Sequence, residues 1–259
     1  MRWVLFLCLP LLTACSVQEM SEPEPMPTPQ MVVRQGAVSN PDETEDEETE
    51  EEVPPERIAY LTIDDGPSES VTLRILDVLQ EEGVKATFFV LPYQGVDHIY
   101  ERILTEGHAM GNHSYSHDYK QLYGADDGVF FREDVQRAKD WMEEQFGHQT
   151  DLFRFPGGSQ SWDRAVIERR REILDELGYR VFDWDVSTGD TAPGPTSKDP
   201  KALISNVMGR TAGRDSLIVL MHDTASKGAT AEALPEIIAQ LRAEGYGFDT
   251  LEHYERPQA

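Results

Sequence analysis

The sequence predicts an α/β protein built on a parallel sheet. Between residues 57 and 251, short apolar runs alternate with segments whose apolar residues recur every three or four positions. Roughly seven strand–helix repeats fit into about 200 residues, which is typical of a parallel sheet covered by helices. By itself the alternation fits either an open doubly wound sheet or a closed barrel.

The first repeat shows how the elements are assigned. Ile58–Ile63 is an apolar run that stops at Asp64-Asp65-Gly66-Pro67. Ser68 or Ser70 is placed to cap a helix, because the apolar residues between 71 and 79 share one helical face. The run therefore predicts a strand that leaves two adjacent carboxylates at its carboxyl end.

The later elements follow by the same criteria. Val135, Ala138 and Met142 share one face of a helix, and Gly178 and Gly245 stand where helices end. The further strands are expected at 86–91, 109–113, 152–155, 179–184, 216–221 and 246–251. The further helices are expected at 97–106, 134–146, 163–177, 199–210 and 231–244, with a loop at 188–197.

The amino terminus is expected to be a targeting segment, residues 1–14. Arg2 precedes an apolar stretch that is too short to span a bilayer as a mature helix. Leu12-Thr13-Ala14-Cys15 resembles the lipobox of bacterial lipoprotein signal peptides, which implies cleavage before Cys15 and a lipid on its sulfur. The implied location is the outer face of the cytoplasmic membrane. An ordinary secretory signal or an uncleaved anchor is the alternative.

An acidic tether, residues 15–56, is expected to separate this anchor from a domain at 57–259. Ser16–Glu56 holds 13 Asp and Glu against one Arg, together with many Pro. Such a segment buries too little apolar surface to fold, so we expect it to be disordered. The net charge of -25 argues against nucleic acid as a partner.

Polar residues cluster at the carboxyl ends of the expected strands. In α/β sheets and barrels these ends meet at one edge, where active sites lie. We therefore expect these six side chains, from five strands, to converge: Asp64, Asp65, His113, Arg154, Asp190 and His222.

His113 and His117 indicate a metal site within this group. Two histidines four residues apart face the same way on a helical turn and can share a metal. With one carboxylate they form a ligand set of the catalytic type, which keeps positions open. The alternatives are a surface histidine pair and, for His222, a histidine at a helix end.

The motifs resemble those of polysaccharide deacetylases of the NodB-homology type, carbohydrate esterase family 4, over residues 57–251. Thr62-Ile63-Asp64-Asp65-Gly66-Pro67 is similar to the first family motif, which implies Asp64 as general base and Asp65 as metal ligand. His113-Ser114-x-x-His117 is similar to the second and implies the other two ligands. Arg154-Phe155-Pro156 resembles the third, whose Arg orients the base.

The remaining motifs imply the other roles. Leu220-x-His222 resembles the fifth motif, in which the Leu lines the acetyl pocket and the His is the general acid. Trp184 and Asp190 fall in the fourth, and Asp190 is implied as the partner of His222, with Asp185 as the weaker candidate. The family fold is a distorted (β/α)7 barrel in a single domain, with a divalent metal, Zn²⁺ being expected and Co²⁺, Ni²⁺ or Mn²⁺ the alternatives.

Two departures from the family pattern concern the substrate groove. Gly157 replaces a Tyr of the third motif, so the amide of Gly157 would serve as oxyanion donor while the aromatic ring is missing. Thr191 follows Asp190 where the family has a Trp, and Trp184 or Trp162 is the candidate substitute.

The resemblance implies hydrolysis of N-acetyl groups on N-acetylhexosamine residues of a cell-envelope polysaccharide, with peptidoglycan as the expected substrate. A chitooligosaccharide deacetylase, an acetylxylan O-esterase and a metal-bound glycan-binding protein are the alternatives. The sequence leaves the substrate sugar, the native metal and the oligomeric state open.

Overall fold

Eight strands form one sheet in the computed structural model, which describes residues 56–125 and 127–255, and every strand pair in this part of the chain is parallel. The order is β5-β4-β3-β2-β1-β7-β6, and β8 pairs with the start of β1. The strands are β1 (Arg57–Asp64), β2 (Thr87–Val90), β3 (Ala109–Asn112), β4 (Leu152–Phe153), β5 (Arg180–Val181), β6 (Val186–Ser187), β7 (Ser216–His222) and β8 (Tyr246–Phe248).

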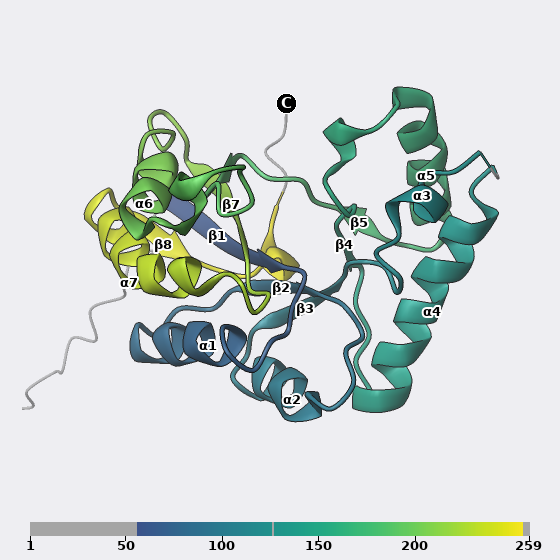
Figure 1. Cartoon of the computed structure of the whole chain (residues 1–259), viewed down its shortest axis with the longest axis horizontal. Helices are drawn as coiled ribbons and strands as arrows, with labels where there is room; N and C mark the ends of the chain where they lie inside the picture. The colour runs from purple at the N-terminus through teal and green to yellow at the C-terminus, as the bar shows by residue number, and fades with distance from the viewer. Residues whose placement is uncertain (1–55, 126, 256–259) are drawn as a thin grey trace, which may run out of the picture. The chain divides into compact units, whose positions relative to one another are not determined.

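Helices cover the sheet in two groups (Figure 1). The helices are α1 (Thr72–Glu81), α2 (Asp97–Thr105), α3 (Tyr119–Leu122), α4 (Val129–Phe146), α5 (Arg164–Glu176), α6 (Pro200–Met208) and α7 (Gly228–Ala243). The first, second, sixth and seventh lie against β1, β2 and β7, whereas α3, α4 and α5 lie together beside β4 and β5. Short 3₁₀ turns occupy 159–161, 195–198 and 251–253.

The predicted distorted (β/α)7 barrel in a single domain is confirmed. The sheet curls, and within the described residues no ladder joins its two end strands, β5 and β6, so the ring stays open there. Consecutive strand residues point to opposite faces. Ala59, Leu61 and Ile63 of β1 accordingly pack under the helices, while Tyr60 packs on the inner face.

The strand periodicity places polar groups on the inner face. Thr62 and Asp64 follow Tyr60 at intervals of two, and both are buried. The inner face is therefore apolar at the amino end of β1 and polar at its carboxyl end, where the strand-end residues gather.

Several element boundaries differ from expectation. Helix α1 has Val71 at its N-cap and no side-chain cap, so Ser68 and Ser70 do not cap it. The Ser68 hydroxyl instead donates to the carbonyl of Asp223, at 2.6 Å. Helix α4 begins at Val129 rather than 134, after Gly128 with φ 87°.

The region 179–187 was also assigned differently. The expected strand 179–184 is reduced to β5, and the structure adds β6, where no element is expected. The chain leaves the sheet after Val181 because the carbonyls of Phe182 and Asp183 accept hydrogen bonds from Arg154. No helix within 56–125 and 127–255 is long and apolar enough to cross a membrane. The expected signal peptide, Cys15 and the tether lie outside the described residues.

Candidate active site

The strand-end residues gather around one pocket at the carboxyl edge of the sheet. Asp64 and Asp65 end β1, His113 follows β3, Arg154 follows β4, and His222 ends β7. The cavity measures about 220 Å³. It is lined by Asp64, Asp65, His113, Tyr119, Gly157, Trp184, Ser187, Thr191, Leu220 and His222.

Three side chains at this pocket could hold a metal ion. One ligand atom from each of Asp65, His113 and His117 lies within 4.8 Å of the other two. Oδ1 of Asp65 is 3.3 Å from Nε2 of His113 and 3.1 Å from Nε2 of His117. These are the three ligands that the motifs implied, and the structure brings them together.

The donor chemistry of the triad fits a divalent cation. Nδ1 of His113 lies 2.9 Å from the carbonyl of Arg154, which can only accept, so Nδ1 carries the proton. In the neutral ring Nε2 then presents a lone pair to the Asp65 carboxylate, and a cation between them removes that repulsion. When no ion is bound, protonated rings of His113 and His117 donate to Asp65 instead; burial opposes ionisation of Asp65, but these hydrogen bonds outweigh it and hold the pKa of Asp65 well below its usual range.

The expectation that His113 and His117 share a helical turn is wrong. They belong to a loop in which Ser114 has φ 74° and His117 has φ 51°. Buried Asp134 on α4 accepts hydrogen bonds from the amides of Tyr115, at 2.7 Å, and Ser116, at 3.1 Å. The fixed loop, not a helix, directs both imidazoles at Asp65.

A buried arginine, Arg154, fixes the carboxylate of Asp64. Arg154 is fully buried, and its Nη1 donates to Oδ1 of Asp64 at 2.9 Å and to the hydroxyl of Thr62 at 2.6 Å. Its Nε donates to the carbonyl of Phe182 at 3.0 Å, and Nη2 to that of Asp183 at 3.2 Å. Four acceptors thus fix the guanidinium, which in turn fixes one oxygen of Asp64.

His222 and Asp190 form a second hydrogen-bonded pair. Nδ1 of His222 lies 2.9 Å from Oδ1 of Asp190, while Oδ2 accepts from the His222 amide and the Thr230 hydroxyl, both at 2.8 Å. Burial lowers the pKa of His222, but the hydrogen bond and charge of Asp190 outweigh it and raise that pKa. Asp185, the weaker candidate, instead pairs with Arg214 at 3.0 Å.

Two glycines leave room for aromatic walls. A Cβ atom on Gly157 would lie 3.5 Å from the Tyr119 hydroxyl and 3.7 Å from Trp162, and one on Gly158 would lie 2.5 Å from Trp184. Tyr119 and Trp184 both line the pocket. The rings of Tyr119, on α3, and of Trp184, just before β6, therefore lie beside Gly157 and Gly158. Gly157 is the position at which the third motif of the family has a Tyr.

Asp223 is a further buried acid, and no sequence pattern selects it. The Thr72 hydroxyl donates to its Oδ2 at 2.6 Å, and a side chain on Gly66 would overlap its carboxylate. Burial raises the pKa of Asp223 to about 7, and the charge of Asp65 adds to this rise. It lies beneath the turn that follows the two site carboxylates.

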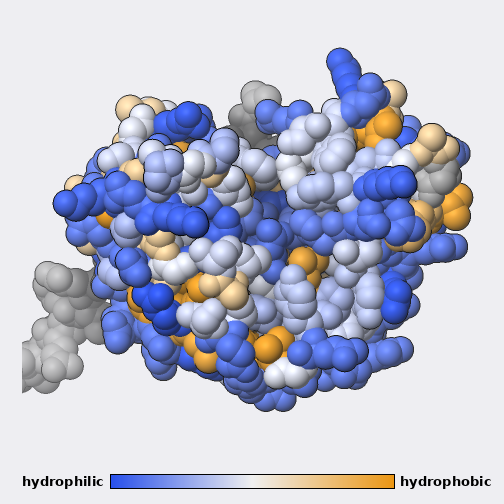
Figure 2. Space-filling model, in the orientation of Figure 1, coloured by the Kyte–Doolittle hydropathy of each residue, from blue (hydrophilic) through white to orange (hydrophobic). Residues whose placement is uncertain are grey.

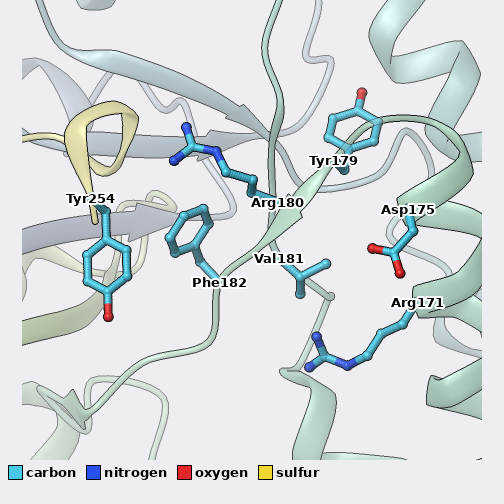
Figure 3. A pocket seen from close by; sticks show the side chains of 7 residues that line it. All are labelled: Arg171, Asp175, Tyr179, Arg180, Val181, Phe182 and Tyr254. Atoms are coloured by element: carbon cyan, nitrogen blue, oxygen red, sulfur yellow. The ribbon is translucent and has the colours of Figure 1, made fainter. Parts of the chain in front are cut away.

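A larger cavity, about 570 Å³, lies beside β5 and does not belong to this site (Figure 3). Figure 3 shows Arg171 and Asp175 reaching it from α5, and Phe182 and Tyr254 at its other side. None of the residues that the sequence singles out lines it. Arg180 there is already paired with Asp151.

The fold and the site together define a class of protein. A family model described as polysaccharide deacetylase matches residues 51–182. The chain belongs to this family, whose members are hydrolases that act on carbon–nitrogen bonds in polysaccharides.

Particular relatives refine this placement. A peptidoglycan-N-acetylglucosamine deacetylase of Bacillus cereus is 31% identical over 202 residues, which are 76% of this chain and 87% of that protein. The peptidoglycan-N-acetylglucosamine deacetylase PgdA of Listeria monocytogenes is 31% identical over 76% of this chain but only 38% of its own length. A CE4 esterase from Streptococcus mutans superposes with a TM-score of 0.68 at 32% identity, covering 75% of this chain and 86% of that one.

Proposed function

We propose that this protein is a metal-dependent deacetylase that removes N-acetyl groups from N-acetylglucosamine residues of peptidoglycan. The observation that carries the proposal is the placing of Asp64, the Asp65–His113–His117 triad and His222 around one cavity. The relatives named as peptidoglycan deacetylases support the choice of polymer.

The triad would hold the metal, and Zn²⁺ is the expected ion. When bound, the cation supplies electrophilic activation of the acetyl carbonyl and of the attacking water. Asp64 accepts a proton from that water as its oxygen bonds to the carbonyl carbon, and Arg154 keeps the accepting carboxylate in place. Arg154 orients the carboxylate of Asp64, because its buried guanidinium is itself fixed by hydrogen bonds to four acceptors.

The leaving group and the developing oxyanion need two further donors. His222, kept protonated by Asp190, donates a proton to the amine nitrogen as the carbon–nitrogen bond breaks. The Gly157 amide is assigned as a donor to the oxyanion, and Leu220 is buried where it lines the acetyl pocket. The products are acetate and a free amino sugar.

Location is part of the proposal. A lipid anchor at Cys15, followed by an acidic tether of about 40 residues, would hold the domain outside the cytoplasmic membrane and within reach of the wall. A chitooligosaccharide deacetylase and an acetylxylan O-esterase remain the rival activities, since the same residues serve either acetyl ester or amide.

The test is acetate release by the purified protein from peptidoglycan fragments, chitin oligomers and acetylxylan. We expect release from peptidoglycan that stops with chelator and returns with Zn²⁺. If none of the three substrates gave chelator-sensitive acetate release, the proposed deacetylase activity would be rejected. Faster release from acetylxylan than from the other two would favour the acetylxylan O-esterase.

A second measurement distinguishes the role of Asp64 as general base from the role of His117 as metal ligand. Asp64→Asn should abolish acetate release while calorimetric Zn²⁺ binding persists, whereas His117→Ala should lose Zn²⁺ binding as well. Asp77→Asn, an exposed acid on α1, is the matched control and should change neither. Activity retained in Asp64→Asn would contradict the assignment of the base.

A further inference from the structure

The catalytic pocket continues into a second cavity. Trp184 and Ser187 line both, and the adjacent glycines 157 and 158 line one each. The second cavity measures about 300 Å³, which is in the range of small-ligand sites. Its other lining residues include Gln160, Ser161 and Arg210. The two cavities are therefore adjoining compartments that share the Trp184 side chain as a wall.

The indole that the compartments share is held in place. A Cβ atom on Gly158 would lie 2.5 Å from it, so the ring packs directly on the glycine backbone. The guanidinium of buried Arg154 lies 5.8 Å from the ring centre. An aromatic wall with polar groups beyond it suits a sugar, whose ring has apolar C–H faces and hydroxyl edges.

Three charged residues line the second compartment, Asp183, Asp185 and Arg210, and the two carboxylates already have partners within the protein. Asp183 accepts from the Ser159 amide at 2.9 Å and lies 3.5 Å from Arg171. Asp185 pairs with Arg214, as described above, and accepts from the Ile218 amide at 2.8 Å. Both lining carboxylates are thus already satisfied.

Arg210 differs from its neighbours. It follows α6 and is exposed, and its guanidinium forms no ion pair or hydrogen bond with another side chain in the part of the chain that the structure describes. The face in Figure 2 is largely hydrophilic, and the chain carries a net charge of -25, so an anionic glycan would be repelled at long range. A local unpaired cation next to the catalytic pocket offsets that repulsion.

We propose that the second compartment binds the sugar unit next to the one that is deacetylated, and that Arg210 pairs with a carboxylate carried by that unit. This inference rests on the proposed function and specifies its substrate class: an anionic glycan rather than neutral chitin. The guanidinium presents two parallel N–H groups, which match a carboxylate. That carboxylate belongs either to a lactyl ether on the sugar or to a peptide joined to it.

The experiment compares tetrasaccharides of equal length. The neutral one is chitotetraose, the second alternates N-acetylglucosamine with N-acetylmuramic acid, and the third carries peptides on the lactyl groups. For Arg210→Gln, kcat/KM should fall about tenfold on the acidic substrates and stay unchanged on chitotetraose. Arg210→Lys should recover part of the loss, and the loss should shrink as ionic strength rises.

The controls keep the outcomes distinct. Arg74→Gln removes the same charge from the surface of α1 and should leave every substrate unaffected. A loss on the peptide-free acidic substrate assigns the lactyl carboxylate, and a loss only on the peptide-bearing one assigns the peptide. Equal effects of Arg210→Gln on neutral and acidic substrates, or none on either, overturn the inference. No acetate from any substrate with the unmodified protein instead refutes the proposed function.

Discussion

Arg154→Met is the substitution with the best-defined structural cost. The side chain is fully buried, and its guanidinium donates to Asp64, Thr62 and the carbonyls of Phe182 and Asp183. Methionine fills much of the space but supplies no donor, so the buried Asp64 carboxylate is left without its counter-charge.

The magnitude follows from that loss. Removing one partner of a buried ion pair costs about 3–5 kcal/mol, because the other charge stays buried. For a domain of about 200 residues each kcal/mol lowers Tm by roughly 2–4 °C, so we expect a decrease of about 6–20 °C. Asp64→Asn in the Arg154→Met background should restore part of the loss, with a coupling free energy of about 0.5–3 kcal/mol.

The assay is thermal and urea unfolding followed by circular dichroism, with chelator present so that metal binding does not contribute. Arg164→Met on α5, where the side chain is 92% exposed, is the control and should stay within about 0.5 kcal/mol of the unmodified protein. An Arg154→Met protein as stable as the control would refute the view that this arginine neutralises and fixes Asp64.

Three further predictions concern the pocket and its acids. Tyr119→Ala should raise KM for oligosaccharides several-fold with a smaller change in kcat, because the ring lines the pocket and is not one of the groups proposed to transfer a proton. Asp190→Asn should move the alkaline limit of kcat/KM to lower pH, because Asp190 raises the pKa of His222 and the proposed general acid acts in its protonated form. Asp223→Asn should be more stable than the unmodified protein above pH 7, and urea unfolding should show this advantage shrinking toward about pH 4. In that range the native carboxyl, with its pKa raised to about 7, holds a proton that the unfolded chain has lost.

Each of these predictions has a result that contradicts it. Lys120→Ala, on the same short helix, controls for the Tyr119 substitution, and equal KM values for the two variants would exclude the ring as a wall. An unchanged alkaline limit in Asp190→Asn would show that another group titrates there. A pH-independent stability difference in Asp223→Asn would show that this acid is not protonated in the native state.

Periodicity was sufficient for the sheet and most helices. Ile58–Ile63 and Ser216–Met221 are long enough for their apolar character to show, and both are strands in the structure. The two residues of β6 and the four of α3 are too few to display a period. Their positions depend on contacts with distant parts of the chain, which the local sequence does not contain.

The same limit applies to the site. Asp64, Asp65 and His222 were selected because they end strands, and strand ends converge in any parallel sheet. Asp134 and Tyr119 were missed, since one lies within α4 and the other begins the four-residue helix α3, and only tertiary packing brings them to the loop of His117. The sequence signal for Asp134 is an acid on the apolar face of an amphipathic helix, beside Val135.

The backbone at the triad has a thermodynamic consequence. In the described residues, four non-glycine residues have positive φ, and Asp65, Ser114 and His117 are three of them. Such conformations cost of order 1–3 kcal/mol each and persist only where surrounding contacts enforce them. The domain therefore gives up global stability to keep the side chains of the proposed metal site arranged before any ion arrives. Selection for thermostability alone would favour glycine at these positions, and at Asp65 and His117 it would remove the very side chains proposed to hold the ion.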